Sequence, residues 1–592
     1  MNISGGDLLL RSIAQEKVRY IFGVVGGQWL PFMDALYREG KNLGVEYIGT
    51  RHEQAAAHMA DAYARLTGIP GVCLGTVGPG AVDLVPGAYP AYADSIPIVI
   101  LTVQNQTWKI YPDHGSTQGC NQLDLFKGVV KWNGLISHWK RIPEMVQRAF
   151  RTAAGGQPGP VHLDIPVDVL AQMGPEEDVR IVPAERYRAT KLPVGNPELV
   201  KEAAKILVEA EFPLIHPGGG LMRSKASKEL AELADYLGAA VTGSVCARDV
   251  LPNDHPLYYA AASMGALTAM GQADAVLVVG SSVCDYDFWG QYPPWGHPDK
   301  QKWIQVDIDP EMIGVNRDVD VPIIGDAKET LKAILEEVKK LTDKKPQNPA
   351  LKACTEAAEN QRQTYNQFIE SDITPIHPLK IIKEVREFFP KNAISIIDGG
   401  NTALWYTYLN LIYEPGTFLQ AADSGHLGVG LPYAIAAKLT EPSRPVYAVC
   451  GDGSFMLNIQ ELETAARLEV PIIIIVNDDR QWGMIKGGQK LAFEERYIGV
   501  DFTDVRYDLV AQAMGCFGER VTEPKEIRPA LERAVKSNKP AVLDVVVDRE
   551  ANLVPPDLAM INAIWLEGVE MPTVEEKVPE KPKVREEVEE AA

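Results

Sequence analysis

The sequence predicts an α/β fold of three domains, each with a doubly wound parallel sheet that has helices on both faces. The chain has 592 residues, which is too long for a single hydrophobic core. Short apolar runs alternate with helical segments and end in glycine-containing turns, as residues 18–24 do at Val25-Gly26-Gly27. A regular alternation of this kind is typical of parallel sheets whose strands are joined by helices.

Changes in composition along the chain suggest the domain limits. We expect the first domain at residues 1–170, the central domain at 195–345 and the third domain at 375–555. Residues 170–195 are polar and contain prolines, which is typical of a linker. Residues 346–375 are polar and predict a helical connection.

A separate C-terminal segment covers residues 556–592. An apolar stripe of helical spacing runs through it, made of Leu558, Ile561, Trp565 and Val569. This stripe predicts a helix that either covers the active site as a lid or packs on its own domain. From Glu575 onward the segment is rich in Glu, Lys, Pro and Val, which predicts disorder.

The composition excludes several classes of protein. With 46% hydrophobic and 23% charged residues, the chain has an ordinary globular composition. Its net charge of −21 argues against a nucleic-acid-binding face. The seven cysteines are scattered without a Cys-x-x-Cys pair, which is typical of free thiols in a reducing compartment. Neither a signal peptide nor a membrane helix is expected, so we predict a cytoplasmic protein.

Two acidic turns follow two neighbouring predicted strands in the third domain. Residues 446–450 are apolar and break at Gly451-Asp452-Gly453-Ser454, and residues 471–476 run into Asn477-Asp478-Asp479. Parallel strands joined by one helix bring both turns to the same sheet edge, where open α/β sheets bind ligands. Glycines let the backbone approach a phosphate, and a helix N-terminus favours its charge. The aspartates supply the oxygen ligands that Mg²⁺ prefers.

The sequence leaves two choices for the second metal ligand, Asp478 and Asp479. Asp479 lies 27 residues after Asp452. Gly-Asp-Gly alone would also fit an ordinary strand–turn–helix unit of a Rossmann-like domain. The second acidic turn at this spacing favours a site for a metal and a diphosphate.

These turns resemble the metal–diphosphate motif of thiamine diphosphate (ThDP) enzymes, in the acetolactate synthase, benzaldehyde lyase and 2-hydroxyacyl-CoA lyase group. The resemblance covers residues 1–555 and implies pyrimidine-binding, central Rossmann-like and diphosphate-binding domains in that order. It implies that Asp452, Asp479 and the backbone carbonyl of Gln481 hold Mg²⁺, although the family usually has Asn at the second position. The cofactor contacts that it implies in the third domain are Gly400, Asn401, Thr402, Leu427, Gly451, Gly453, Ser454, Gln481, Trp482, Gly483 and Met484.

Leu427 has a particular role in this resemblance. It lies in the segment 424–432, Ser-Gly-His-Leu-Gly-Val-Gly-Leu-Pro, which matches the family's wedge segment. The match implies that Leu427 presses ThDP into its bent, reactive form. A plain core residue is the alternative interpretation, and it is compatible with the wedge.

Glu53 is the candidate catalytic residue of the first domain. Arg51-His52-Glu53 resembles the family's catalytic element, at the start of a predicted helix among apolar and small residues. A carboxyl group there is costly unless it hydrogen-bonds a partner. The resemblance implies that Glu53 exchanges a proton with the N1′ nitrogen of the cofactor's aminopyrimidine ring. The alternative is a helix-start glutamate that the helix dipole favours.

The resemblance implies further contacts from both ligand-binding domains. Val25 and Gly26 would contact the cofactor, with Val25 where acetolactate synthases usually have Pro. Gln28 and Asn121 are candidate substrate contacts. Gly488 falls where acetolactate synthases place a bulky Trp, so we expect room for a larger acceptor there. Glu494 is a candidate proton-transfer residue, with an exposed helix charge as the alternative.

The central domain differs from that of acetolactate synthases, which holds FAD. Here residues 280–285, Gly-Ser-Ser-Val-Cys-Asp, replace the arginine-containing segment expected after the corresponding strand. This replacement argues against FAD. The alternatives left open are ADP, the adenylate of CoA, or no ligand.

The resemblance implies an enzyme that reversibly cleaves or forms a C–C bond next to a carbonyl. A 2-hydroxyacyl-CoA lyase, which releases formyl-CoA and an aldehyde or ketone, is favoured by Val25, the Gly400-Asn401-Thr402 turn, the missing FAD segment, Gly488 and the C-terminal stripe. The alternative is an acetolactate synthase-like decarboxylating carboligase of 2-oxo acids. A catalytically silent ThDP-fold binding protein is disfavoured, because Glu53 and both acidic turns are present.

The resemblance also implies an oligomer. The family builds its active site between the first domain of one subunit and the third domain of another. We therefore expect Glu53 and Asp452 to act together in a homodimer or a homotetramer.

Overall fold

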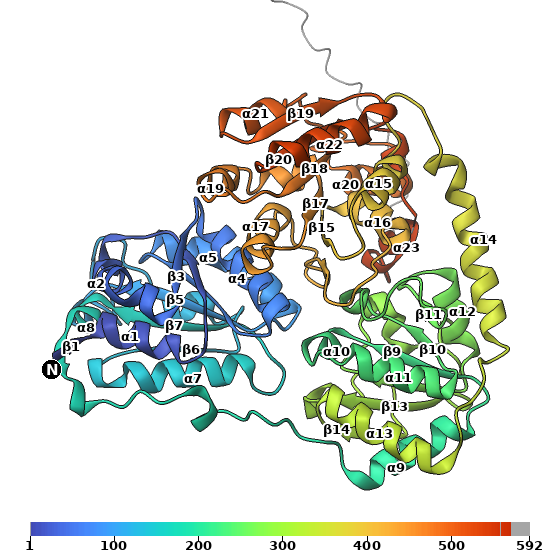
Figure 1. The fold of residues 1–592 in the computed structure, drawn as a ribbon, viewed down its shortest axis with the longest axis horizontal. Helices are drawn as coiled ribbons and strands as arrows, with labels where there is room; N and C mark the ends of the chain where they lie inside the picture. The colour runs from blue at the N-terminus through green and yellow to red at the C-terminus, as the bar shows by residue number, and fades with distance from the viewer. Residues whose placement is uncertain (1, 557, 570–592) are drawn as a thin grey trace, which may run out of the picture.

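The computed structural model describes residues 2–556 and 558–569. It contains three six-stranded parallel sheets, each flanked by helices (Figure 1). This architecture confirms the predicted α/β fold of three doubly wound domains. Among the described residues, no helix is both long enough and apolar enough to cross a membrane. The disorder predicted from Glu575 onward lies outside the described residues.

The first sheet has the strand order β3-β2-β4-β5-β7-β6. Its strands are β2 (Tyr20–Gly23), β3 (Glu46–Gly49), β4 (Gly71–Gly75), β5 (Ile98–Gln104), β6 (Trp132–Leu135) and β7 (Val161–Pro166). Helices α4 (Glu53–Thr67) and α5 (Pro79–Ala93) share a hydrophobic cluster with one face, and α1 (Gly5–Ala14) and α7 (Ile142–Ala154) with the other. Shorter elements are α2 (Leu30–Ala35), α3 (Lys41–Leu43), α6 (Gln122–Phe126), α8 (Val167–Ala171) and the antiparallel pair β1 (Asn2–Ser4) and β8 (Met173–Pro175).

The central sheet has the strand order β11-β10-β9-β12-β13-β14. Its strands are β9 (Pro213–Pro217), β10 (Ala240–Thr242), β11 (Tyr258–Tyr259), β12 (Ala275–Val279), β13 (Lys302–Asp307) and β14 (Val321–Ile324). Its helices are α9 (Pro197–Glu209), α10 (Gly219–Arg223), α11 (Ser227–Leu237), α12 (Met264–Gln272) and α13 (Ala327–Leu341). The long helix α14 (Leu351–Ile369) then runs along the side of the molecule to the third domain (Figure 1).

The third sheet has the strand order β16-β15-β17-β18-β20-β19. Its strands are β15 (Ile394–Asp398), β16 (Phe418–Leu419), β17 (Val446–Gly451), β18 (Ile473–Asp478), β19 (Phe517–Val521) and β20 (Ala541–Val546). Its helices are α15 (Pro378–Phe388), α16 (Gly400–Leu409), α17 (Gly430–Thr440), α18 (Asp452–Met456), α19 (Glu461–Arg467), α20 (Gly483–Ala492), α21 (Tyr507–Ala513), α22 (Ile527–Ser537) and α23 (Leu558–Trp565). The order β15-β17-β18 brings the turns after these three strands together at one edge.

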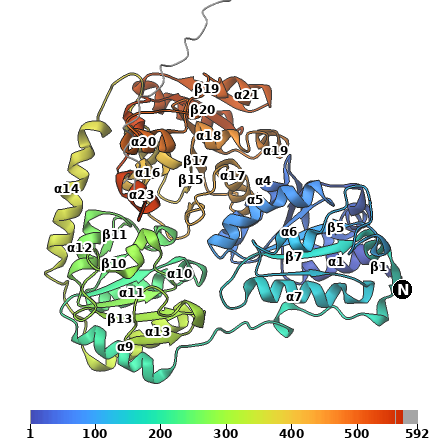
Figure 2. The same cartoon turned by 180° about the vertical axis from the view of Figure 1, so that it is seen from behind.

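The first and third domains of the chain pack against each other through α4 and α17 (Figure 2). One hydrophobic cluster contains residues of both helices and of both sheets. At the N-terminus of α4, the backbone N–H groups of Arg51 and His52 donate hydrogen bonds of 3.0 and 3.1 Å to Oε1 of the buried Glu461 on α19. The third domain therefore holds the start of the helix that carries Glu53.

Candidate active site

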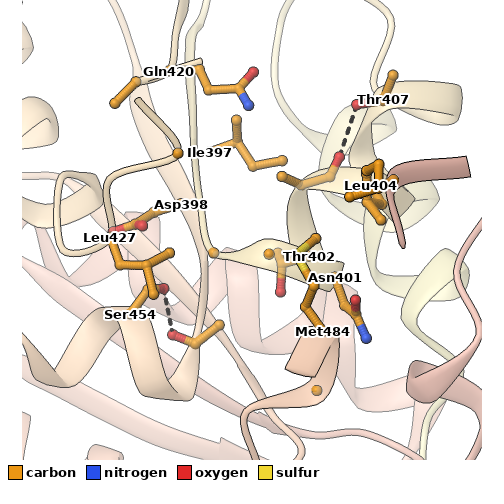
Figure 3. A pocket seen from close by; sticks show the side chains of 18 of the residues that line it. Ile397, Asp398, Asn401, Thr402, Leu404, Thr407, Gln420, Leu427, Ser454 and Met484 are labelled. Carbon is orange, nitrogen blue, oxygen red and sulfur yellow. Dashed lines mark hydrogen bonds between the residues drawn. The ribbon is translucent and has the colours of Figure 1, made fainter. Parts of the chain in front are cut away.

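A cavity of about 370 Å³ lies between the central and third domains (Figure 3). The turns after β15, β17 and β18 form one part of its wall, and loops of the central domain form another. Helix α23 adds Met560, Ile561 and Trp565. The cavity therefore opens at the carboxyl ends of parallel strands, where α/β sheets bind ligands.

Asp452 and Asp479 lie together in this cavity. Gly451 pairs with Asn477 in the register of β17 and β18, so the two acidic turns are adjacent. Both carboxyl groups are buried, at 1% and 3% exposure. Burial, followed by the charges of Asp479 and Asp478, raises the pKa of Asp452 to about 9, and burial also raises the pKa of Asp479. Two buried carboxyl groups placed this close need a cation if both are to ionise.

The donor set fits Mg²⁺. Oδ2 of Asp452 is buried and accepts no hydrogen bond from any described residue, which leaves a free oxygen for a hard cation. No group of three or more His, Cys, Asp and Glu side chains suited to a metal occurs in the described part of the chain. The predicted set has two carboxylates and a backbone carbonyl, so it does not depend on such a group.

Asp478 is separate from the cavity. It ends β18, and its Oδ2 accepts a hydrogen bond of 3.3 Å from Nη2 of Arg520. Asp479 lines the cavity and Asp478 does not. Of the two ligand choices that the sequence left open, Asp479 is thus the one beside Asp452.

Two amide side chains orient Asp479. Its Oδ2 accepts hydrogen bonds of 2.6 Å from Nδ2 of Asn552 and 3.0 Å from Nε2 of Gln481. Oδ1 of Asn552 in turn accepts from Nε1 of Trp405 at 2.8 Å. Asn552 is not among the site residues predicted from the sequence. The available signal was its position just after β20, the next strand beyond β18 in the sheet.

A cradle of small residues surrounds the acidic turns. Residues 399–402 and 451–454 line the cavity where α16 and α18 begin. Oδ1 of Asn401 is buried without a hydrogen-bond partner among the described residues. Trp482 packs on Gly453, where an added Cβ would lie 2.5 Å from the indole. Backbone N–H groups at helix starts beside free polar atoms are suited to a diphosphate.

Leu427 lies on the wall of the cavity, beside Ser454 and Asp398 (Figure 3). The loop that carries Leu427 is held in place by Asp398. Its Oδ2 accepts hydrogen bonds of 3.0 Å from the N–H of Gly428 and 2.8 Å from that of Gly430. Gly428 has a φ of 88°, which favours glycine. Met484, another predicted contact, also lines the cavity.

Glu53 does not line this cavity, and every lining residue lies between 245 and 565. Glu53 begins α4, is 7% exposed and faces its own domain, where an added Cβ on Gly80 would lie 2.5 Å from its Oε1. Burial raises the pKa of Glu53, and the charge of Asp83 adds to this. Val25 and Gly26 precede η1 (Gly27–Trp29) in the same domain, and Gln28 lies in η1.

The substrate candidates Asn121 and Gly488 and the proton-transfer candidate Glu494 lie outside the cavity. Asn121 is exposed and caps α6, where its Oδ1 accepts a hydrogen bond of 3.2 Å from the N–H of Asp124. Glu494 lies beyond the end of α20, is exposed and pairs with Arg496 at 2.9 Å. Beside Gly488, an added Cβ would lie 2.9 Å from Oδ1 of Asn562, at the end of a side chain on α23. Room for a larger acceptor at Gly488 therefore stays a prediction.

His426 is a second residue whose place the sequence analysis did not anticipate. It lines the cavity, and its Nε2 lies 3.3 Å from Nε2 of Gln54 on α4. The same Gln54 nitrogen lies 3.3 Å from Nε2 of the fully buried His58. The residue that follows Glu53 therefore contacts the wall of this chain's cavity, while Glu53 itself faces elsewhere.

Cofactor-dependent α/β enzymes place their ligands in cavities of this kind, and the fold and the site put the chain in that class. Comparison with known proteins identifies the family. Residues 3–125, 200–334 and 398–545 match the N-terminal TPP binding domain, the central domain and the C-terminal TPP binding domain of thiamine pyrophosphate enzymes. The chain belongs to the thiamine pyrophosphate enzyme family.

Several relatives span nearly the whole chain. A probable acetolactate synthase large subunit of Methanococcus aeolicus is 34% identical over 95% of this chain and 95% of its own length. A protein of the same description from Methanocaldococcus jannaschii is 35% identical, again over 95% of both chains. The acetolactate synthase isozyme 3 large subunit of Escherichia coli K12 is 30% identical over 96% of this chain and 99% of its own.

Proposed function

We propose that this protein is a ThDP- and Mg²⁺-dependent carboligase that decarboxylates one 2-oxo acid and joins its acyl group to a second carbonyl compound. The observation that carries the proposal is the buried pair Asp452 and Asp479 beside a glycine cradle, in a chain of the thiamine pyrophosphate enzyme family. The names of the relatives support the acetolactate synthase-like reaction.

The third domain would hold the diphosphate and its metal. Asp452, Asp479 and the backbone carbonyl of Gln481 would bind Mg²⁺, whose charge would offset that of the diphosphate. Gly400, Asn401, Thr402, Gly451, Gly453 and Ser454 would form the phosphate cradle, with Trp482, Gly483 and Met484 beside it. Leu427 would pack against the bound cofactor and fix its bent form.

When bound, ThDP supplies a nucleophilic carbon and an electron sink for breaking a bond next to a carbonyl. Glu53 would hold a proton at the N1′ ring nitrogen, a role suited to a carboxyl group whose pKa is raised by burial. Val25 and Gly26 would support the same ring. The apolar residues of α23 would help to exclude water from the cavity.

The active site would require a second copy of the chain. The cavity wall contains no first-domain residue, so Glu53 would come from the partner in a homodimer or a homotetramer. An exposed apolar stripe on α5 supports such an interface. It consists of Val82, Tyr89 and Tyr92, with exposures of 48%, 44% and 46%, at spacings that share one helix face.

Two reactions were left open by the sequence, and the comparisons favour the acetolactate synthase-like alternative over the 2-hydroxyacyl-CoA lyase that was the leading prediction. The relatives reported above are named acetolactate synthase. One argument for the lyase also weakens, because Gly488 faces the side chain of Asn562 on α23.

The deciding experiment tests two substrates in parallel with purified protein that is loaded with ThDP and Mg²⁺. With pyruvate we expect release of CO₂ and formation of acetolactate. With a short 2-hydroxyacyl-CoA we expect no formyl-CoA. Formation of formyl-CoA without acetolactate would favour the lyase reaction instead. If neither product forms, the proposed function is contradicted.

A further inference from the structure

We propose that Gln54 is a positioning residue that holds the loop of Leu427 through His426, in the cavity of its own chain. The inference rests on the proposed function, in which Glu53 acts in the cavity of the partner. Two consecutive residues of α4 then serve two different active sites. The contact of Gln54 with the third domain carries this assignment.

The loop of residues 424–428 carries Leu427, and its C-terminal side is held by the third domain itself. Oδ2 of Asp398 accepts a hydrogen bond of 3.0 Å from the N–H of Gly428. Nδ2 of Asn458 donates one of 2.7 Å to the carbonyl of the same glycine. These bonds fix the backbone directly after Leu427.

The N-terminal side of the loop is held by the first domain. The N–H of Asp423 donates a hydrogen bond of 3.0 Å to Oδ1 of Asp94, which follows α5. Inside the loop, the N–H of His426 donates to Oγ of Ser424 at 3.2 Å. The ring of His426 then reaches α4, where its Nε2 lies 3.3 Å from Nε2 of Gln54. The backbone directly before Leu427 is therefore tied to the first domain of the same chain.

The amide nitrogen of Gln54 lies between two imidazole rings. It is 3.3 Å from Nε2 of His426 and 3.3 Å from Nε2 of the fully buried His58. An amide nitrogen only donates and carries two hydrogens, so both rings accept through Nε2 and are neutral. Burial lowers the pKa of His426 and brings that of His58 well below its ordinary value, which favours the neutral rings. The amide thus fixes the orientation of His426.

Gln54 belongs to a helix start that is itself held in place. The N–H groups of Arg51 and His52 donate to Oε1 of Glu461 in the third domain. The N–H of Gln54 donates to Nδ1 of His52 at 3.1 Å. Helix α4 also packs against α17, which begins just after the loop (Figure 2). The first turn of α4 therefore gives the loop a fixed support.

Glu53 and Gln54 face different neighbours. Successive residues of an α-helix are turned by about 100° around its axis, and Oε1 of Glu53 lies beside Gly80 of its own domain. Gln54 does not line the cavity, whereas His426 and Leu427 do. Gln54 therefore acts through His426 and does not touch the substrate. A displacement of about 1 Å near the reacting atoms can cost roughly 10²-fold in rate, so loss of this support should slow the reaction.

The first test is Gln54→Leu, which keeps the approximate size of the side chain and removes its donors. We expect kcat for acetolactate formation and the exchange rate of the cofactor's C2 hydrogen to fall together by roughly 10- to 100-fold. The KM for pyruvate and the retention of ThDP should change little. Gln157→Leu is the matched control, because Nε2 of this first-domain glutamine donates to Oγ of Ser95 at 3.0 Å, outside the cavity. C2 exchange at the wild-type rate in Gln54→Leu would overturn the assignment.

Mixed dimers show which cavity each residue serves. Chains with Glu53→Gln and chains with Gln54→Leu are given different affinity tags, combined and purified through both tags. The cavity of the Glu53→Gln chain then has its own wild-type Gln54 and the partner's wild-type Glu53, so activity should rise well above that of either variant alone. If both residues served one cavity, each cavity would carry one defect. Activity no higher than the mean of the two variants would therefore overturn the assignment.

Two further pairs separate this result from the proposed function. Glu53→Gln with Asp452→Ala should recover activity, and failure to recover would contradict the shared active site of the proposed function. Gln54→Leu with Asp452→Ala should not recover, because both residues serve one cavity, and recovery would overturn the assignment of Gln54.

A measurement on the loop itself does not depend on turnover. Deuterium exchange at the backbone N–H groups of residues 424–428 should be faster in Gln54→Leu than in the wild type or in Gln157→Leu. Equal exchange in the three proteins would contradict the support of the loop by Gln54. If the wild type forms no acetolactate, the proposed function fails, and this comparison still decides whether Gln54 holds the loop.

Discussion

The side-chain amide of Asn552 donates a hydrogen bond of 2.6 Å to Oδ2 of Asp479. Asn552 comes from η11 (Ala551–Leu553), 73 residues further along the chain than the acidic turn. Groups that orient a metal ligand commonly affect metal affinity almost as much as the ligand itself. The link between these two residues therefore makes the end of the third domain part of the proposed metal site.

The first prediction concerns this link. Asn552→Ala should weaken Mg²⁺ binding by roughly 10- to 100-fold, because Asp479 loses the amide that orients it and Trp405 loses its acceptor. The Mg²⁺ concentration that half-saturates ThDP retention measures the effect. Asn562→Ala is the control, since that amide donates at 2.9 Å to the carbonyl of Leu558 within its own helix. Equal Mg²⁺ affinity in both variants would show that Asn552 has no part in metal binding.

The second prediction separates the adjacent acidic residues. Asp452→Ala and Asp479→Ala should lose ThDP retention and activity together, because the diphosphate loses its bridging cation. Asp478→Ala should retain ThDP, since Asp478 pairs with Arg520 outside the cavity. Equilibrium dialysis with ThDP and Mg²⁺ measures retention. Unchanged cofactor affinity in Asp452→Ala would rule out its assignment as a metal ligand.

The third prediction concerns Glu53. Glu53→Gln should keep the fold and the binding of Mg²⁺ and diphosphate, which belong to the third domain. Gln can hydrogen-bond the ring nitrogen but cannot transfer a proton, so the rate should fall by roughly 10²- to 10⁴-fold. Exchange of the cofactor's C2 hydrogen with deuterium, followed by NMR, should slow in proportion. Exchange at the wild-type rate in Glu53→Gln would show that Glu53 begins a helix and has no role in proton transfer.

The fourth prediction is a pH dependence of stability from Glu461. Burial raises its pKa to about 7 from an ordinary value of 4.5. The neutral form is favoured in the folded protein, so this contribution to the free energy of unfolding is complete below pH 4.5 and is lost as the pH rises through 7. The loss is at most roughly 3 kcal/mol. Urea unfolding between pH 5 and 8 should show this loss of unfolding free energy in the wild type and a smaller loss in Glu461→Gln. A Glu463→Gln control that differed from the wild type as much would point to a general charge effect.

The fifth prediction concerns flavin. The purified protein should be colourless and active without added FAD, because Ser281, Ser282 and Val283 stand where an arginine-containing segment was expected. Absorbance near the flavin bands and activity after exhaustive dialysis provide the measurement. A yellow preparation with stoichiometric flavin would show that the central domain binds FAD after all.

Periodicity and turn chemistry predicted the architecture because several of the parallel strands, such as β4, β12 and β17, are apolar runs that end at or just before glycine. Residues 446–450 and 471–476 became β17 and β18 with the expected turns. The edge strands β11 and β16 escaped prediction because each has two residues, too few to produce a pattern. Their pairing depends on a neighbouring strand distant in sequence, which no local signal records.

The candidate site was predictable where its residues share one motif, as Asp452 and Gly453 do. It was not predictable where a side chain enters from a distant segment. Asn552 and Arg248 lie beside the cavity because loops from different parts of the chain converge there. Gly488 is a further example. Its neighbour Asn562 lies on α23, and the position of that helix could not be derived from residue spacing.

The position of Asn552 and α23 after the acidic turns in the chain has a consequence for biosynthesis. On a translating ribosome the acidic turns emerge well before η11 and α23. Until residues 551–565 have left the exit tunnel, Asp479 lacks its amide partner and one wall of the cavity is missing. The first two sheets can form earlier in translation, whereas the pocket is complete only once residues 551–565 have emerged and folded.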